Sequence, residues 1–358
     1  MGYGNEEVFL SPEERQALIA SLLGKQVEIV VDRPVGYVHE TKGITLHYTL
    51  NYGYLPGILG GDGEEQDVYI LGVSQPLESF RGKIIGAVLR ADDNEDKLLA
   101  APEGMHFTRN QVEEAVRFVE QYFDSRVYLP PQKIFLFSFD DGTIWDGRLV
   151  ELLNKWGIRG TFNLNSGLED FVWEFEGKPV IRQKLSRTTQ QYRGHEVASH
   201  SLHHPWLNSL TPPQLSREVG EDCEALKEIF GLGEIGFGVP FTACGEREIH
   251  LIRKYVRYIR LSEFSDSYAL PRDEYHIPIH GLYNDPDIRE KLRRFAESQE
   301  ETALFVMAGH SYELEYRDHW AYLEELLQEV KALGVESMTT MEFVNRYYPK
   351  KQGGNNHD

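Results

Sequence analysis

The rhythm of the sequence changes at residues 129–132, and this change constrains the fold more than any other feature. Before it, short β-rich runs are separated by glycine, proline and acidic clusters; after it, apolar strands alternate with amphipathic helices. The junction "VYLPPQK" holds two prolines and has no periodic pattern. A chain of 358 residues is long enough for two cores. We therefore expect domains over residues 1–128 and 129–349 and a disordered polar tail over 350–358.

The N-terminal part reads as a small β-barrel with flanking helices. "SPEERQALIASLLG" is a capped first helix, with Ser11 as the N-cap and Gly24 as the stop. Five short β-rich runs follow, and "TRNQVEEAVRFVEQYF" then has apolar residues at helical spacing. Many short strands separated by turn residues are typical of a barrel or closed sheet.

The C-terminal part alternates strands and helices. "KIFLFSF", "GTFNL", "EVASH" and "TALFVMAGH" read as strands, with helices such as "DGRLVELLNKWG" between them. This alternation predicts a parallel α/β barrel or sheet. In such folds the active site gathers at the C-terminal ends of the strands.

Composition limits the partners. The formal charge of −20 argues against nucleic acid and against a membrane as main partners, because both would repel the chain. Two cysteines give no disulfide framework and favour a reducing compartment. The N-terminus lacks a basic start, and no run approaches the roughly 20 apolar residues of a spanning helix. We expect a cytoplasmic protein with a small-molecule substrate; the oligomeric state stays open.

Two aspartates end the strand "FLFSFDDG" and are candidates for metal-assisted chemistry. Asp140 and Asp141 point in different directions, so one could hold a metal while the other faces the water bound to it. The plainer alternative is a turn in which one aspartate caps the next helix.

Three histidines in "ASHSLHHPW" supply candidate ligands for the same site. His200 and His204 are four residues apart and would share one face of a helical turn, whereas His203 would point elsewhere. With Asp141 they form a two-histidine, one-carboxylate set suited to Zn²⁺, or to Co²⁺, Mn²⁺ or Ni²⁺. His310 closes the strand "LFVMAGH", where it could protonate a leaving group.

The motifs "FSFDDG", "GHEVASHSLHH" and "VMAGH" resemble those of the polysaccharide deacetylase (carbohydrate esterase family 4) homology domain, over about residues 133–349. The resemblance implies a deformed (β/α) barrel that removes acetyl groups from N-acetyl sugars. It implies that Asp140 is the general base and His310 the general acid. It also implies that the metal ligands are Asp141, His200 and His204.

The third motif departs from this family. An arginine that orients the base normally precedes the proline–aromatic pair, here Pro240 and Phe241, but Gly238 occupies its position. Arg260, at the end of the next predicted strand, is our candidate substitute; the alternative is a surface arginine. We expect Pro240, Phe241 and His280 to contact substrate. Glu313 would tune the pKa of the general acid or begin a solvated helix.

A second candidate site lies in the N-terminal part. "GDGEEQD" holds Asp62, Glu64 and Asp67 around a glycine turn, and "DDNEDK" adds Asp92 and Lys97. Carboxylates that converge in this way could bind hard cations such as Mg²⁺. The plainer alternative is an acidic surface turn.

This part resembles the family I inorganic pyrophosphatases over about residues 26–102, through "NYGY", "DGEEQD" and "DDNEDK". The resemblance implies Mg²⁺ ligands at Asp62, Glu64, Asp67 and Asp92, and phosphate contacts from Tyr54 and Lys97. The domain is shorter than full-length members, and a hairpin with basic residues is missing. Glu64 also stands where the family has an aspartate.

We expect a metal-dependent hydrolase that deacetylates an N-acetylated sugar or a related small amide, with a pyrophosphatase-like N-terminal domain. A nucleotide-linked N-acetyl sugar would engage both domains. Two alternatives concern the N-terminal domain, which would either hydrolyse pyrophosphate or another phosphoanhydride with Mg²⁺, or only bind a diphosphate. In another alternative the deacetylase domain is an inactive lectin-like module, which the loss of the third-motif arginine favours.

Overall fold

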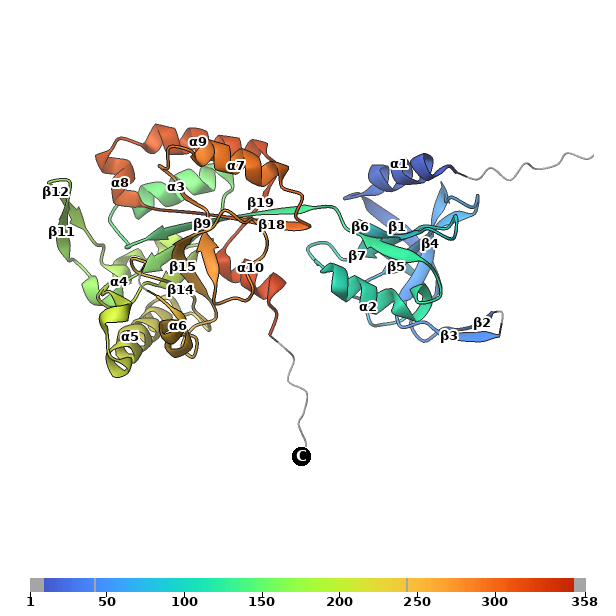
Figure 1. Cartoon of the computed structure of the whole chain (residues 1–358), viewed down its shortest axis with the longest axis horizontal. Coiled ribbons are helices and arrows are strands. Elements are labelled where there is room, and N and C mark those ends of the chain that lie inside the picture. The colour runs from blue at the N-terminus through green and yellow to red at the C-terminus, as the bar shows by residue number, and fades with distance from the viewer. Residues whose placement is uncertain (1–9, 42, 243, 351–358) are drawn as a thin grey trace, which may run out of the picture. The chain divides into compact units, whose positions relative to one another are not determined.

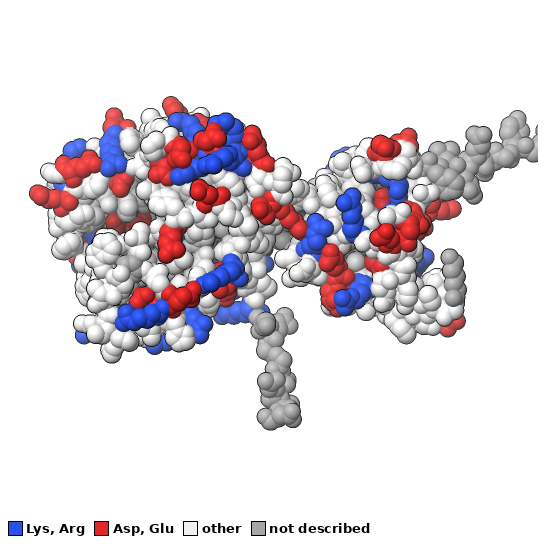
Figure 2. Space-filling view, viewed as in Figure 1, with Lys and Arg blue, Asp and Glu red and all other residues white. Residues whose placement is uncertain are grey.

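A computed structural model of the chain describes residues 10–41, 43–242 and 244–350. Its contacts divide the chain into two compact units, residues 1–130 and 131–358 (Figure 1). All but the first residue of the predicted tail lies outside the described residues. No helix in the described ranges is both long and apolar enough to cross a membrane. Basic and acidic side chains are interspersed on the visible faces in Figure 2.

The first unit is built on a closed β-barrel. Its strands pair around a ring in the order β1, β4, β5, β7, β6 and back to β1, and β8 extends the sheet beside β6. The elements are α1 (Pro12–Leu22), β1 (Gln26–Arg33), β2 (Val38–Thr41), β3 (Ile44–His47), β4 (Asn51–Leu59), β5 (Glu65–Ile70), β6 (Ser79–Arg90), β7 (Lys97–Ala101), α2 (Arg109–Glu120) and β8 (Ser125–Tyr128). This is the small barrel that the sequence predicts.

Both faces of the central barrel strands are buried. Val68 and Leu98 belong to a cluster that α1 joins, whereas the next residues along the same strands, Tyr69 and Leu99, belong to a cluster that α2 joins. Alternation along a strand sends these neighbours to opposite faces. The continuous apolar runs of β5 and β7 therefore reflect burial inside the barrel and, on its outer face, beneath α2.

Strand β4 was not predicted, because "NYGYLPGIL" contains a proline and two glycines. Gly53 is required by close packing: a Cβ atom there would lie 1.9 Å from the carbonyl oxygen of Val30 on β1. Pro56 lies where the pairing register with β5 shifts, between Tyr54 and Leu59. Both residues thus occupy places where a strand tolerates them.

The second unit is a parallel barrel surrounded by helices (Figure 1). Its strands are β9 (Gln132–Asp140), β10 (Gly160–Leu164), β13 (Glu196–Ser199), β14 (Phe237–Gly238), β15 (Ile259–Phe264), β16 (Ile277–Ile279), β17 (Gly281–Leu282), β18 (Thr302–His310) and β19 (Glu336–Met338). A separate hairpin joins β11 (Val172–Phe175) and β12 (Lys178–Ile181). The α-helices are α3 (Asp146–Trp156), α4 (Leu185–Thr188), α5 (Pro212–Phe230), α6 (Glu246–Ile252), α7 (Ile288–Glu297), α8 (Ser311–Tyr316), α9 (Trp320–Ala332) and α10 (Thr340–Tyr347). Short 3₁₀ turns span Ser166–Leu168, Thr189–Tyr192 and Leu207–Ser209.

The barrel closes through the segment 277–282. Strand β16 pairs with β15, and β17, which follows after a single residue, pairs with β18. His280 is that residue: its backbone N–H donates to the Val306 carbonyl, and its Nδ1 accepts from the Val306 N–H at 3.0 Å. The imidazole thus replaces one backbone acceptor where the strand changes partners. This is the deformed (β/α) barrel of the prediction.

The barrel interior leads to the candidate site. Ile134 and Leu136 on β9 and Leu304 and Val306 on β18 form one buried cluster with residues of α10. Continuing the same alternation, Asp140 and His310 lie at the C-terminal ends of these two strands, and they are direct partners in the strand register.

Candidate functional site

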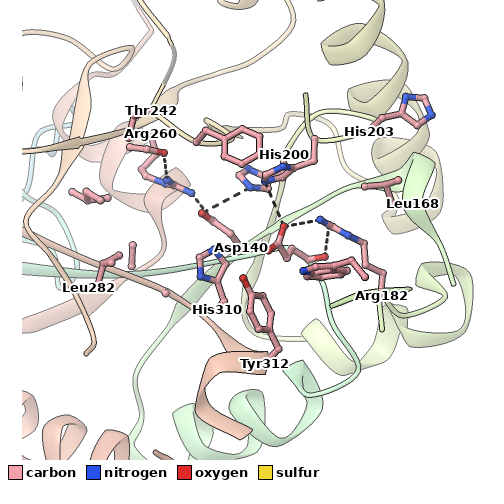
Figure 3. A pocket seen from close by; sticks show the side chains of 18 of the residues that line it. Asp140, Leu168, Arg182, His200, His203, Thr242, Arg260, Leu282, His310 and Tyr312 are labelled. Carbon is pink, nitrogen blue, oxygen red and sulfur yellow. Dashed lines mark hydrogen bonds and ion pairs between the residues drawn. The ribbon is translucent and has the colours of Figure 1, made fainter. Parts of the chain in front are cut away.

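The chain brings the predicted base, acid and metal ligands of the second unit into one cavity. Asp140, Asp141, His200, His204 and His310 all line a cavity of about 590 Å³. In Figure 3, His310 and Asp140 lie near the centre, with Arg260 on one side and Arg182 on the other. The site is therefore at the C-terminal end of the barrel strands, as expected for this fold.

Asp141, His200 and His204 form a cluster that could hold a metal ion. One ligand atom from each lies within 4.8 Å of the others. The histidines do not meet on a helical turn, as the spacing predicted; they meet on an irregular loop in which Ser201 has φ +65° and His204 has φ +54°. Asp141 has φ +85°. These left-handed conformations are costly for residues with a side chain and are typical of functional sites.

The protonation of the two histidines fits metal binding. His200 Nδ1 lies 2.7 Å from the Gly238 carbonyl oxygen, so Nδ1 carries the proton and Nε2 is left with a free lone pair. Burial lowers the pKa of His200 well below its usual value, and burial also lowers the pKa of His204. Two neutral imidazoles and one carboxylate are a donor set that divalent transition metals accept.

Asp141 is ionised in its buried position. Burial raises the pKa of this carboxyl, but Arg182 and the neighbouring histidines outweigh that effect, and its pKa is lowered overall. Arg182 Nη2 donates to Asp141 Oδ1 at 2.7 Å. Sequence reasoning missed Arg182, because no motif marks an arginine that follows a peripheral hairpin strand.

Asp140 is oriented by two donors on one of its oxygens. Its Oδ1 accepts from Asn163 Nδ2 at 2.7 Å and from Arg260 Nη2 at 2.5 Å. Its Oδ2 lies 3.9 Å from His200 Nε2. The second oxygen is therefore turned toward the metal-ligand cluster (Figure 3). Asn163 is the second residue that sequence reasoning missed; its register partner on β9 is Asp140 itself.

Arg260 occupies the space that a side chain at position 238 would need. Gly238 and Arg260 are partners on the neighbouring strands β14 and β15. A Cβ atom on Gly238 would lie 2.6 Å from Arg260 Nη2 and 2.6 Å from the Asn163 carboxamide. The absence of a side chain on β14 thus allows the guanidinium from β15 to reach Asp140.

His310 is cationic. Burial lowers the pKa of this imidazole, but the hydrogen bond to Glu313 and the nearby carboxylates of Asp141 and Asp140 raise it to about 9. His310 Nδ1 lies 3.0 Å from Glu313 Oε1, and Nε2 lies 3.8 Å from Asp141 Oδ2. Glu313 therefore pairs with His310 and keeps its ring oriented toward the cavity.

Four other predicted residues have mixed outcomes. Phe241 lines the cavity, but Pro240 is buried and does not. His280 does not line it either: Nδ1 accepts from Val306, and Nε2 lies 3.0 Å from the Ser267 carbonyl, so both ring nitrogens serve the barrel closure. His203 is exposed and contacts Glu218, and Figure 3 shows its ring turned away from the cluster.

Among the described residues of the first unit, the predicted metal ligands do not all line one cavity. Asp67 and Lys97 line a cavity of about 530 Å³ together with Tyr52, but Asp62, Glu64, Asp92 and Tyr54 do not. Glu64 and Asp92 are exposed, and Asp62 accepts a turn hydrogen bond from the Glu64 N–H. Asp67 and Glu95 both pair with Lys97. Tyr54 lies two residues beyond Tyr52 on β4, beside exposed Val30 of β1.

The family match lies almost entirely in the second unit. Residues 129–255 match the polysaccharide deacetylase family. Chitin deacetylase 1 of Cryptococcus neoformans var. grubii is 25% identical over 122 residues, which are 34% of this chain and 24% of the relative. The chain thus spans about a quarter of the length of this curated relative.

Solved structures with low similarity include a chitin deacetylase and one domain of a xylanase. The chitin deacetylase of Colletotrichum lindemuthianum is 17% identical, with a TM-score of 0.43 over 63% of this chain and 95% of that one. The Xyl-CE4 domain of a multidomain xylanase from the hindgut metagenome of Trinervitermes trinervoides is 18% identical, with a TM-score of 0.42 over 60% of this chain and 91% of that one.

The family match contains part of the candidate site. It includes the aspartate pair, the two histidine ligands and Gly238, and it ends before Arg260 and His310. The family match and the curated relative together support a polysaccharide deacetylase domain in the second unit.

Proposed function

We propose that the second unit is a metal-dependent deacetylase that hydrolyses the N-acetyl group of an uncharged sugar. The observation that carries this proposal is that a candidate base and a candidate acid lie in the same cavity as the candidate metal ligands. Asp140 turns one oxygen toward the cluster of Asp141, His200 and His204, and cationic His310 is its register partner on β18. A pure binding module, such as an inactive lectin, needs neither a base nor an acid.

The side chains divide the work of hydrolysis. A divalent cation bound by Asp141, His200 and His204 would polarise the acetyl carbonyl and make water more acidic. Asp140 Oδ2 takes a proton from the attacking water, while Arg260 and Asn163 hold Oδ1 in place. His310 then gives its proton to the departing amine, and Glu313 stabilises the imidazolium that supplies it.

The cavity wall favours an uncharged substrate. Arg182 and Arg260, the arginines that line it, are each paired with an aspartate of the site. The large exposed aromatic side chains in the described part of this unit gather here: Phe171, Phe241 and Phe264 line the cavity, and Trp206 stacks on Phe241 with ring centroids 4.2 Å apart. Such surfaces suit the apolar faces of sugar rings better than a diphosphate. This argues against the nucleotide-linked substrate that the fusion of two domains suggested.

The test is acetate release from neutral N-acetylated oligosaccharides and nucleotide-linked N-acetyl sugars. Protein stripped of metal is compared with the same protein reloaded with Zn²⁺ or Co²⁺, and Asp140→Asn serves as the matched variant. We expect metal-dependent release that is largest with the neutral substrates and lost in the variant. Equal release from the variant would remove Asp140 as the base, and preference for the nucleotide sugars would refute the uncharged class.

For the first unit we propose a small-anion-binding module rather than a hydrolase. Its cavity contains Arg33, whose Nη1 donates to the Tyr48 hydroxyl at 2.6 Å and whose guanidinium lies over the Tyr52 ring. Among the described residues, Arg33 forms an ion pair with Asp32 at 3.8 Å, whereas Asp67 is engaged by Lys97. Among its described lining residues, the cavity thus offers a guanidinium to an anion, while both of its carboxylates near Lys97 are paired with that lysine.

Calorimetric titration with inorganic pyrophosphate, with and without Mg²⁺, tests this second function. We expect binding without release of phosphate, and weaker binding in Arg33→Gln, with exposed Arg81→Gln as the control. Mg²⁺-dependent phosphate release would favour the hydrolase instead, and an Arg33→Gln affinity equal to wild type would exclude the cavity as the site.

A further inference from the structure

Arg182 connects the two segments that carry the metal ligands. It follows β12, it is 5% exposed, and its guanidinium lies 4.9 Å from the centre of the Trp173 ring. Nη2 donates to Asp141 Oδ1 at 2.7 Å, and Nη1 donates to the Asp141 backbone carbonyl at 2.6 Å. One side chain therefore holds both the backbone and the carboxylate of the same ligand residue.

The same guanidinium reaches the histidine loop through an amide. Nη1 also donates to Asn165 Oδ1, and Asn165 Nδ2 donates to the carbonyls of His200 at 2.6 Å and Ser201 at 2.7 Å. Every residue of this network is buried: Arg182, Asp141, Asn165, His200 and Ser201. The aspartate and histidine segments, far apart in sequence, thus share one hydrogen-bonded network.

The ligand loops need such support because their backbone is unfavourable. Asp141, Ser201 and His204 all have positive φ values, and conformations of this kind persist only where the surroundings enforce them. The planar fork of an arginine can satisfy several acceptors at fixed angles, which a lysine ammonium cannot do. The main chain of Arg182 is also fixed in place, because its N–H donates to the Phe171 carbonyl.

We propose that Arg182 is a positioning residue of the metal centre, which fixes Asp141 and, through Asn165, the His200–His204 loop in the geometry that binds the ion. This inference rests on the metal-dependent function proposed above. Arg182 acts through Asp141 and Asn165 and supplies the site with preorganisation rather than with a ligand atom. Partners of this kind typically change metal affinity by about 10- to 100-fold when they are removed.

The experiment measures Zn²⁺ and Co²⁺ affinity by chelator competition in the full-length protein, together with the visible absorption spectrum of bound Co²⁺. Arg182→Gln removes the charge and the fork, Arg182→Lys keeps the charge, and exposed Arg187→Gln is the control on the same segment. We expect at least a 10-fold loss of affinity and an altered Co²⁺ spectrum in both position-182 variants, and wild-type behaviour in the control.

Each other result has a distinct meaning. Wild-type affinity and spectrum in Arg182→Lys would overturn the positioning role, because charge alone would then suffice. Unchanged or tighter binding in Arg182→Gln would overturn it as well. If Arg182→Gln does not fold, as circular dichroism of the metal-free protein would reveal, Arg182→Lys still decides. Failure of the wild type to bind either ion would instead contradict the proposed function.

Discussion

At the scale of single residues, the geometry of the site depends on the hydrogen-bond partners of its two adjacent aspartates. Asp140 and Asp141 are adjacent, yet each is paired with its own arginine, Arg260 from β15 and Arg182 from beyond β12. Each arginine satisfies one carboxylate oxygen. For Asp140 this leaves the other oxygen turned toward the cluster, and in the proposed mechanism this oxygen is the base.

Asp140→Asn should abolish proton removal while preserving the shape of the site, because the carboxamide oxygen can still accept from Arg260 and Asn163. General-base catalysis contributes about 10²- to 10⁴-fold, so we expect kcat to fall by at least about 100-fold. Metal affinity, measured by chelator competition, should stay close to that of the wild type. A large loss of affinity would mean that Asp140 is a ligand.

The strand partners Gly238 and Arg260 should be exchangeable. Arg260→Gly should lower kcat by about 100-fold, since a misplaced base costs roughly that much. Gly238→Arg alone should be at least as harmful, because its side chain would collide with Arg260 and Asn163. The double variant Gly238→Arg/Arg260→Gly should recover part of the activity in the acetate assay. Additive losses in the double variant would contradict a shared role.

At the scale of elements, helix α3 begins with a buried carboxyl. Asp146 stands in its first turn, where the helix dipole favours a negative charge. Burial nevertheless raises the pKa of Asp146 to about 7, despite hydrogen bonds from Ser311 and Tyr192. Desolvation therefore exceeds the effect of the dipole and the two hydroxyls.

This carboxyl predicts a pH dependence of stability. Because its pKa is raised from 3.8 in the unfolded chain to about 7 in the folded state, its stabilising contribution is present below pH 3.8 and is lost as the pH rises toward 7. The loss amounts to a few kcal/mol, at about 1.4 kcal/mol per pKa unit. Asp146→Asn should flatten this part of the curve of unfolding free energy against pH, measured in urea. An unchanged slope between pH 4 and 7 would contradict the assignment.

Helix α10 packs against the interior of the second barrel. Its Phe343 belongs to the buried cluster that contains residues of β9 and β18. Phe343 is fully buried. Phe343→Ala should therefore cost about 3–5 kcal/mol of unfolding free energy, the usual range for such cavities. Tyr348→Phe, which keeps the ring, is the milder control in the same urea titration. A cost below about 1 kcal/mol would mean that α10 is not part of the cooperative core.

At the scale of the whole molecule, each unit has its own buried hydrophobic clusters, and no cluster of described residues contains members of both units. Separate cores favour separate cooperative transitions. In scanning calorimetry we expect two transitions. Zn²⁺ at about 100 times its Kd should stabilise only the transition of the second unit, by about 2.7 kcal/mol. Pyrophosphate should shift only the transition of the first unit. A single transition shifted by both ligands would contradict the independence of the units.

The sequence by itself determined the local structure and most of the candidate site residues of the second unit. Capping residues define the ends of helices such as α1 and α2, and apolar runs define strands such as β5, β7 and β9, because these signals act between residues close together in the chain. The residues of the candidate metal cluster were also predicted from local signals. The aspartate motif that ends β9 and the histidine loop are each short and lie at a strand end.

Tertiary structure decided what depends on strand register and on distant partners. Arg260 reaches Asp140 because β14 and β15 pair at Gly238, and Arg182 reaches Asp141 from a hairpin 41 residues away. His280 serves the barrel closure, and in the first unit Asp67 is paired with Lys97 while Glu64 remains exposed. Residue type and spacing say which groups are available. Which of them meet is set by the long-range pairing of strands, which no local pattern encodes.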